Sequence, residues 1–137
     1  METKYLQDYV QDEQTKLFEE MGVFFAFSNE QFAKQKEDGV KYVSLGNGTI
    51  CPKENVDEFL ETLSAIQEKG VETDIAENGM DKIIKRELYN YEAFLGSVDL
   101  AIETFKVYNL IEDYKMKVED IVRVFNDEIK KIDFDNY

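Results

Sequence analysis

Histidine is absent from this chain, and cysteine occurs once, at Cys51. Histidine is the commonest general base near neutral pH and the commonest transition-metal ligand, so Ser–His and Cys–His nucleophile pairs are excluded. One cysteine cannot build a Cys/His zinc site or an internal disulfide, and it suits a reducing cytosol. We therefore expect a cytoplasmic protein that is not an enzyme, has no cofactor and no metal, and buries Cys51 as a small hydrophobe.

Proline and long apolar runs are also scarce. Pro52 is the one proline, and no apolar run approaches the roughly 20 residues that span a bilayer. The segment Met1–Val10 contains acids and no apolar core, so it does not resemble a signal peptide. With 43% hydrophobic and 13% aromatic residues, the chain is too apolar for a disordered protein. We expect a single domain over residues 1–137, without membrane contact.

The spacing of apolar residues predicts mostly helix. Helical periodicity runs through Lys4–Met21 and recurs from Pro52, from Met80 and from Val118. Val23–Phe27 is a short apolar run of the kind that forms a buried strand. The expected fold class is α+β and mainly helical, with about five helices and a small antiparallel sheet that includes one β-hairpin.

Short polar motifs predict where elements begin and turn. Ser28 and Gln31 fit a capping box, in which each residue binds a free backbone N–H of the helix start. Gly46-Asn47-Gly48 separates the apolar segments Tyr42–Leu45 and Thr49–Cys51. Because Asn-Gly supplies the positive φ angles of a tight turn, this is the strongest hairpin signal in the chain.

Three further positions predict helix boundaries. Gly22 is expected to end the first helix, and Ser97 to cap a later one. Gly70 is expected to end or interrupt the helix that starts near Pro52.

Bases are few, with 16 against 30 acids and a net charge of −14. Nine acids and one base lie between Glu54 and Asp81, so this stretch carries eight of the fourteen net negative charges. The nine acids are Glu54, Asp57, Glu58, Glu61, Glu68, Glu72, Asp74, Glu77 and Asp81. Such a surface repels nucleic-acid phosphates and attracts a basic protein surface, so we expect no direct nucleic-acid binding.

The first acids of this stretch share one helix face, opposite the apolar stripe. Two like-charge pairs, Glu54/Glu58 and Asp57/Glu61, stand four residues apart, and each costs roughly 0.2–0.5 kcal/mol. A cationic partner would relieve that repulsion. The predicted partner-binding residues are Glu54, Asp57, Glu58 and Glu61, extended by Glu72, Asp74 and Glu77. The alternative is a solvated face that only maintains solubility.

Two other features have alternative interpretations. The aromatic cluster Phe24, Phe25, Phe27 and Phe32 is either core or a pocket for a nucleotide-like signalling molecule, next to Lys34, Lys36 and Lys41. Asp74–Lys85 resembles a calcium loop, but Ala76 and Lys85 stand where ligands are required. A carboxylate-only metal site in a weak metal-dependent hydrolase stays a further alternative.

Three motifs carry a family resemblance. They are Val23–Phe32, Leu45–Ile50 followed by Lys53-Glu54, and Glu87–Glu92 followed by Gly96. Over about Leu17 to Phe105 the chain resembles small uncharacterised proteins, a domain of unknown function, from phages and conjugative elements of low-GC Gram-positive bacteria. The resemblance brings no activity and no functional residues. It implies a cytosolic accessory protein of a mobile element, and such proteins often counter host defence.

Together these observations lead to one expected function and its alternatives. We expect a non-enzymatic acidic accessory protein that binds, and through binding inhibits, a basic nucleic-acid-processing host protein. The alternatives are a sponge for a nucleotide-like signal and the metal-dependent hydrolase. The apolar faces of the last two helices bury either within one chain or across a homodimer.

Overall fold

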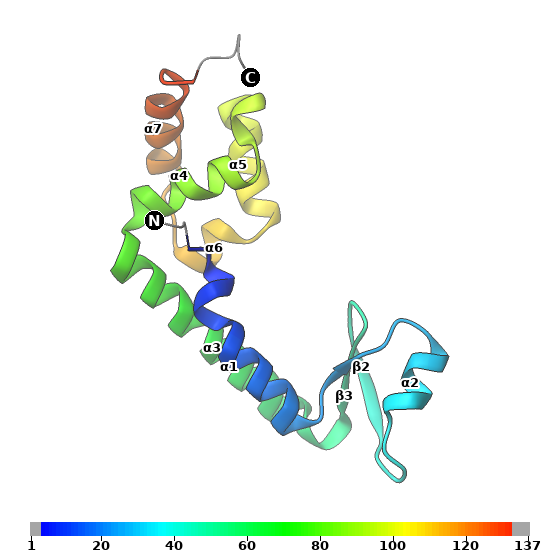
Figure 1. Cartoon of the computed structure of the whole chain (residues 1–137). Coiled ribbons are helices and arrows are strands. Elements are labelled where there is room, and N and C mark those ends of the chain that lie inside the picture. Colours follow the sequence, from blue (N-terminus) through cyan, green and yellow to red (C-terminus); the bar gives the residue numbers. More distant parts are fainter. Residues whose placement is uncertain (1–3, 133–137) are drawn as a thin grey trace. The chain divides into compact units, whose positions relative to one another are not determined.

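The protein is described by a computed structural model over residues 4–132. Within that range it has seven α-helices and one three-stranded antiparallel sheet (Figure 1). The mainly helical α+β prediction is confirmed, but the expected number of about five helices is wrong. The five-residue helix α6 (Leu110–Tyr114) shows why, because one turn is too short to produce an apolar periodicity.

The chain divides into two compact units. We call Leu6–Gly70 the sheet unit, and we call Val71–Tyr137 together with Met1–Tyr5 the helical unit. Helix α3 (Val56–Asn78) contributes residues to both, with the division after Gly70. The expectation of a single domain stays a prediction.

The sheet unit consists of two long helical segments, a short helix and the sheet. Its elements are α1 (Leu6–Met21), β1 (Phe24–Phe25), α2 (Asn29–Gln35), β2 (Tyr42–Gly46), β3 (Thr49–Pro52), a 3-10 turn (Lys53–Asn55) and the first part of α3. The strand order is β1-β3-β2, so β3 is central. Figure 1 shows α1 alongside the first part of α3, with β2 and β3 beyond their ends.

Local chemistry explains the turn and the caps. Asn47 and Gly48 have φ angles of 52° and 78°, which matches the predicted hairpin turn. Ser28 Oγ accepts from Gln31 N at 3.1 Å, while Gln31 Oε1 accepts from Phe27 N at 2.7 Å. The capping box is therefore present, but the Gln31 side chain binds the backbone N–H of Phe27 and not that of the N-cap residue Ser28. Ser97 caps α5 (Val98–Val107) as predicted, accepting from Leu100 N.

The sheet lies between two apolar layers. On one face Leu17, Val23, Cys51 and Phe59 form a buried cluster, with Phe18, Met21, Leu45, Val56, Leu63 and Ile66 packed against it. Cys51 is fully buried, and this burial raises the pKa of its thiol, so it is a core residue. On the other face the rings of Phe24, Phe32 and Tyr42 pack together, which joins α2 to the sheet.

Gly70 does not end or interrupt the helix, which corrects the prediction. Helix α3 continues through it to Asn78. A Cβ atom at Gly70 would lie 2.3 Å from Val10 Cγ1, so the glycine lets α1 and α3 approach closely. This role depends on a residue 60 positions away, which local sequence does not reveal.

The helical unit packs short helices around one core. After α3 come α4 (Met80–Asn90), a 3-10 turn (Ala93–Leu95), α5 (Val98–Val107), α6 and α7 (Val118–Ile129). Its buried apolar residues include Ile83, Ile84, Leu88, Phe94, Ala101, Phe105, Leu110, Tyr114, Met116, Ile121, Val124 and Phe125. The rings of Phe94 and Phe125 lie 5.2 Å apart and connect the 3-10 turn to α7.

The close approach at Gly70 predicts a stability effect. We expect Gly70→Ala to destabilise the protein by about 1–3 kcal/mol through overpacking against Val10. This sign is opposite to the gain of about 1 kcal/mol that alanine gives in an open helix. Urea denaturation measures the change. Adding Val10→Ala removes the clashing methyl groups and should recover part of the loss, whereas a single variant as stable as the parent would contradict the packing.

Candidate functional site

The predicted site residues fall into two groups. Glu54, Asp57, Glu58 and Glu61 are exposed and lie in the sheet unit; we call these four the acidic face. Glu72 and Glu77 are exposed residues of the helical unit, where Asp74 is fully buried. The predicted extension is thus assigned to the other unit, and Asp74 cannot serve as a surface contact.

The acidic face has no cationic partner within residues 4–132. Lys69 pairs with Glu13 at 3.7 Å, and Lys53, which lines a hollow together with Glu54, forms no ion pair with the four residues. Asp57 and Glu61 keep the predicted four-residue spacing within α3, whereas Glu54 lies in the 3-10 turn that precedes the helix. Their repulsion is therefore not relieved by these parts of the chain.

An acidic hollow adjoins this face. It is open to solvent, has a volume of about 570 Å³, and involves only residues of the sheet unit. Its lining residues include Glu19, Glu20, Glu37 and Glu54 as well as Phe18, Phe24 and Tyr42, and no lysine or arginine. Glu54 therefore belongs to both the acidic face and the hollow.

The end of α1 makes this hollow more favourable for a cation. Glu19 and Glu20 lie in the last turn of α1, which contains no basic residue. The carboxyl end of a helix carries partial negative charge, so each acid there is unfavourable, and a cation is favoured by about 0.3–1 kcal/mol. The carboxyl end of α1 and the glutamate side chains thus both bring negative charge to the hollow.

The aromatic cluster does not form one core or one enclosed pocket. Phe25 and Phe27 are 51% and 73% exposed, and their rings stack 6.5 Å apart. Phe24 and Phe32 are half-buried and pack with Tyr42. Of the lysines considered beside the cluster, Lys34 pairs with Glu30 at 3.5 Å.

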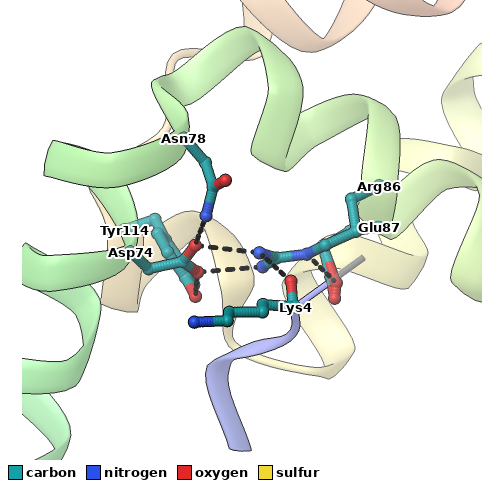
Figure 2. A network of polar contacts seen from close by, with 6 residues as sticks. All are labelled: Lys4, Asp74, Asn78, Arg86, Glu87 and Tyr114. Atoms are coloured by element: carbon teal, nitrogen blue, oxygen red, sulfur yellow. Dashed lines mark hydrogen bonds and ion pairs between the residues drawn. The ribbon is translucent and has the colours of Figure 1, made fainter. Parts of the chain in front are cut away.

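A buried polar network occupies the helical unit (Figure 2). Arg86 donates from Nη1 to Asp74 Oδ1 at 2.9 Å and from Nη2 to Oδ2 at 3.0 Å. Nη1 also donates to the backbone oxygen of Lys4 at 3.0 Å. Asp74 accepts further bonds from Tyr114 Oη at 2.6 Å and from Asn78 Nδ2 at 2.8 Å. The network therefore connects α3, α4 and α6 with Lys4, which lies two positions before the start of α1.

Electrostatics fixes the charges of this network. Burial alone would raise the pKa of Asp74, but hydrogen bonds from Arg86, Tyr114 and Asn78 and the charge of Arg86 hold it below its usual range. Burial and the bond to Asp74 raise the pKa of the Tyr114 hydroxyl. Asp74 is thus a carboxylate whose two oxygens accept four hydrogen bonds. Such a group is a structural anchor and a poor general base.

Glu87 is the exception in the network. It is 6% exposed, and its Oε2 atom is buried without a hydrogen bond, as is Arg86 Nε at 3.6 Å from it. Burial raises the pKa of Glu87, and the charge of Asp74 adds to the rise, although Arg86 acts in the opposite direction. Glu87 is therefore the group of this network whose charge the fold disfavours.

The sequence prediction missed this network, but a signal was present. Asp74 continues the α3 stripe of Phe59, Leu63, Ile66 and Gly70 at spacings of three and four. On α4, Glu87 lies four residues after the buried Ile83 and three after the buried Ile84. An acid on the apolar side of a helix indicates a buried carboxylate that requires a partner.

Comparison with known proteins identifies the family of this chain. The chain matches the model of DUF7659, a family of unknown function, over residues 6–131, and it belongs to that family. Neither a curated protein nor a solved structure was found to match it. Among residues 4–132, no helix combines the length and apolar character that crossing a membrane requires, and no three His, Cys, Asp or Glu side chains are grouped to hold a metal ion.

Two bidentate Asp–Arg pairs provide a matched test of burial. Asp74→Asn leaves Arg86 buried without its counter-charge, so we expect a loss of about 3–5 kcal/mol in unfolding free energy. The control is Asp81→Asn, which breaks the pair with Arg123 at 2.7 and 2.9 Å on the surface. That change should cost about 1 kcal/mol or less. Equal losses in urea denaturation would argue against an anchoring role for Asp74.

The raised pKa of Glu87 predicts that this residue makes the folded protein less stable as the pH rises. Because its pKa is raised in the folded state, the protonated form is favoured, and stability is lost as pH rises from about 4.3, the unfolded value, through the folded pKa. Glu87→Gln cannot lose a proton, so it should become progressively more stable than the parent over that rise. Unfolding free energies measured from acid to neutral pH test this. A difference that does not change with pH would refute the assignment.

Proposed function

We propose that this protein is a non-enzymatic binding protein whose acidic face docks on a basic surface of another protein. One observation carries the proposal: the four carboxylates of the face are exposed and have no cationic partner within residues 4–132. A basic partner would relieve their mutual repulsion and gain attraction at the same time.

The charge density favours a protein partner over literal imitation of DNA. The part of α3 in the sheet unit spans about 22 Å, over which duplex DNA carries about 13 charges. The stretch Glu54–Glu68 supplies five carboxylates. The face therefore supports docking by charge complementarity, with the hollow at Glu54 as a second acidic contact.

The alternatives have less support from the geometry. A nucleotide-like signal would bring phosphate to the hollow beside Phe24 and Tyr42, where four carboxylates would repel it. For a metal-dependent hydrolase, the buried Asp74 offers no free lone pairs suited to a metal, because Arg86, Tyr114 and Asn78 bind both of its oxygens.

The biological setting forms part of the proposal. The family match brings no activity. We infer that the chain is a cytoplasmic accessory protein of a phage or mobile element and that its partner is a basic, nucleic-acid-processing host protein. Occupying the nucleic-acid-binding surface of such a partner would inhibit it, which is a form of anti-defence activity.

The proposal predicts a localised charge effect. A deca-arginine peptide should bind the intact protein, and its affinity should fall between about 50 mM and about 200 mM NaCl. The triple change Asp57→Lys, Glu58→Lys and Glu61→Lys should weaken binding at least about tenfold, or about 1.4 kcal/mol, because it reverses the acidic face. Isothermal titration calorimetry measures both effects.

A second triple variant separates the acidic face from net charge. Glu103→Lys, Glu112→Lys and Asp127→Lys make the same change in total charge on exposed residues of the helical unit. This control should alter the affinity much less than the reversal of the face. Equal weakening by the two triple variants would mean that only net charge matters and would remove the basis of the proposal.

A further inference from the structure

The strand order leaves β2 at an edge of the sheet. Lys53 N donates to Lys41 O at 2.8 Å, and Val43 pairs with Cys51. Hydrogen-bonded and non-hydrogen-bonded pairs alternate in an antiparallel ladder, so Tyr42 and Ser44 occupy the non-hydrogen-bonded positions. Their backbone N–H and C=O groups consequently point away from β3, along the outer edge.

The two edges of this sheet differ. At β1, Gln35 Nε2 from α2 donates to Phe25 O at 2.8 Å, so a side chain occupies a carbonyl of that edge. At β2, no protein group within residues 4–132 binds the outward backbone groups of Tyr42 and Ser44. Edge strands are usually protected by charged side chains or proline, and Tyr42–Gly46 has neither.

The face of β2 that carries Tyr42 is next to the acidic hollow. Tyr42, Phe24 and Pro52 share this face of the sheet and also line the hollow. Glu37 N donates to the Tyr42 hydroxyl at 3.0 Å, which holds Glu37 at the end of the Tyr42 side chain. A residue paired with Tyr42 in a neighbouring strand would have its Cβ atom about 4.5–5.5 Å from that of Tyr42, on the same face.

We propose that β2 accepts an extended basic segment of the partner as an antiparallel fourth strand, with an arginine or lysine opposite Tyr42. The main chain of the segment binds Tyr42 and Ser44, and the cation lies at the hollow that Glu37 and Glu54 line. This inference rests on the proposed function and assigns the contact by which the partner is recognised. Backbone bonds give affinity, and the cation gives specificity.

Charge argues for this occupant over a second copy of the chain. A copy would bring the same net charge of −14 to an edge that already adjoins four carboxylates. A basic strand places opposite charge at the same position, within reach of the rings of Tyr42 and Phe24 for cation–π contact.

The test uses a short blocked peptide in which valine and arginine alternate. With the parent protein and saturating peptide, amide hydrogen exchange at Tyr42 and Ser44 should slow at least about tenfold, while Val43, already paired with β3, serves as the internal reference. N-methylation of the arginine amides, which face β2 in this pairing, should abolish binding. N-methylation of the valine amides, which face solvent, should leave binding within about twofold.

Two variants and three outcomes complete the test. Ser44→Pro removes an outward N–H without cutting the β2–β3 ladder and should weaken peptide binding, whereas Ser44→Ala should not. Binding that tolerates arginine N-methylation and leaves Tyr42 and Ser44 unprotected would overturn the strand addition. If the peptide bound without strand addition and the triple lysine variant of the acidic face still weakened that binding, the proposed function would stand and only the strand addition would be wrong. Protection of the Tyr42 and Ser44 amides that increases with protein concentration in the absence of peptide would identify a second copy of the chain as the occupant. That result would also overturn the inference.

Discussion

The excess of carboxylates over cations constrains the whole charge arrangement of this protein. With 30 acids and 16 bases, at least fourteen carboxylates cannot be paired one to one within the chain. Arg86 is committed to Asp74 and Glu87, and Arg123 to Asp81 and Asp120. Both arginines therefore serve the helical unit, where they fix buried or interhelical contacts. The acidic face of the sheet unit has no arginine to draw on, and its charge is available to a partner.

Helix α3 shows how position decides the role of a carboxylate. Asp74 continues the apolar stripe, is buried, and becomes an anchor because Arg86, Tyr114 and Asn78 satisfy it. Asp57, near the start of the same helix, is exposed. Desolvation offsets much of the attraction in a buried ion pair of this kind, whereas removing one partner is costly because it leaves an uncompensated buried charge. The two kinds of acid in one helix are thus separated by geometry, although their chemistry is the same.

Local chemistry made part of the fold predictable. Ser28 and Ser97 cap helices and Asn47-Gly48 turns the hairpin, because each acts on backbone groups within a few residues. Gly70 was misinterpreted because its reason for being glycine is Val10, far away in sequence. The pairing of Asp74 with Arg86 was missed for the same reason, although its place on the apolar stripe was visible in the sequence. The exposure of Phe25 and Phe27 was not predictable either, because it depends on which distant residues cover each ring in the folded state.

The central claim is that the unpaired carboxylates of the acidic face form the binding surface. The most direct test follows the side-chain carboxyl carbon resonances of the intact protein by NMR during titration with the deca-arginine peptide. The account predicts that the largest shifts occur at Glu54, Asp57, Glu58 and Glu61, with Asp74 unchanged because Arg86 already occupies it. Shifts spread evenly over all exposed acids, or largest in the helical unit, would contradict the claim.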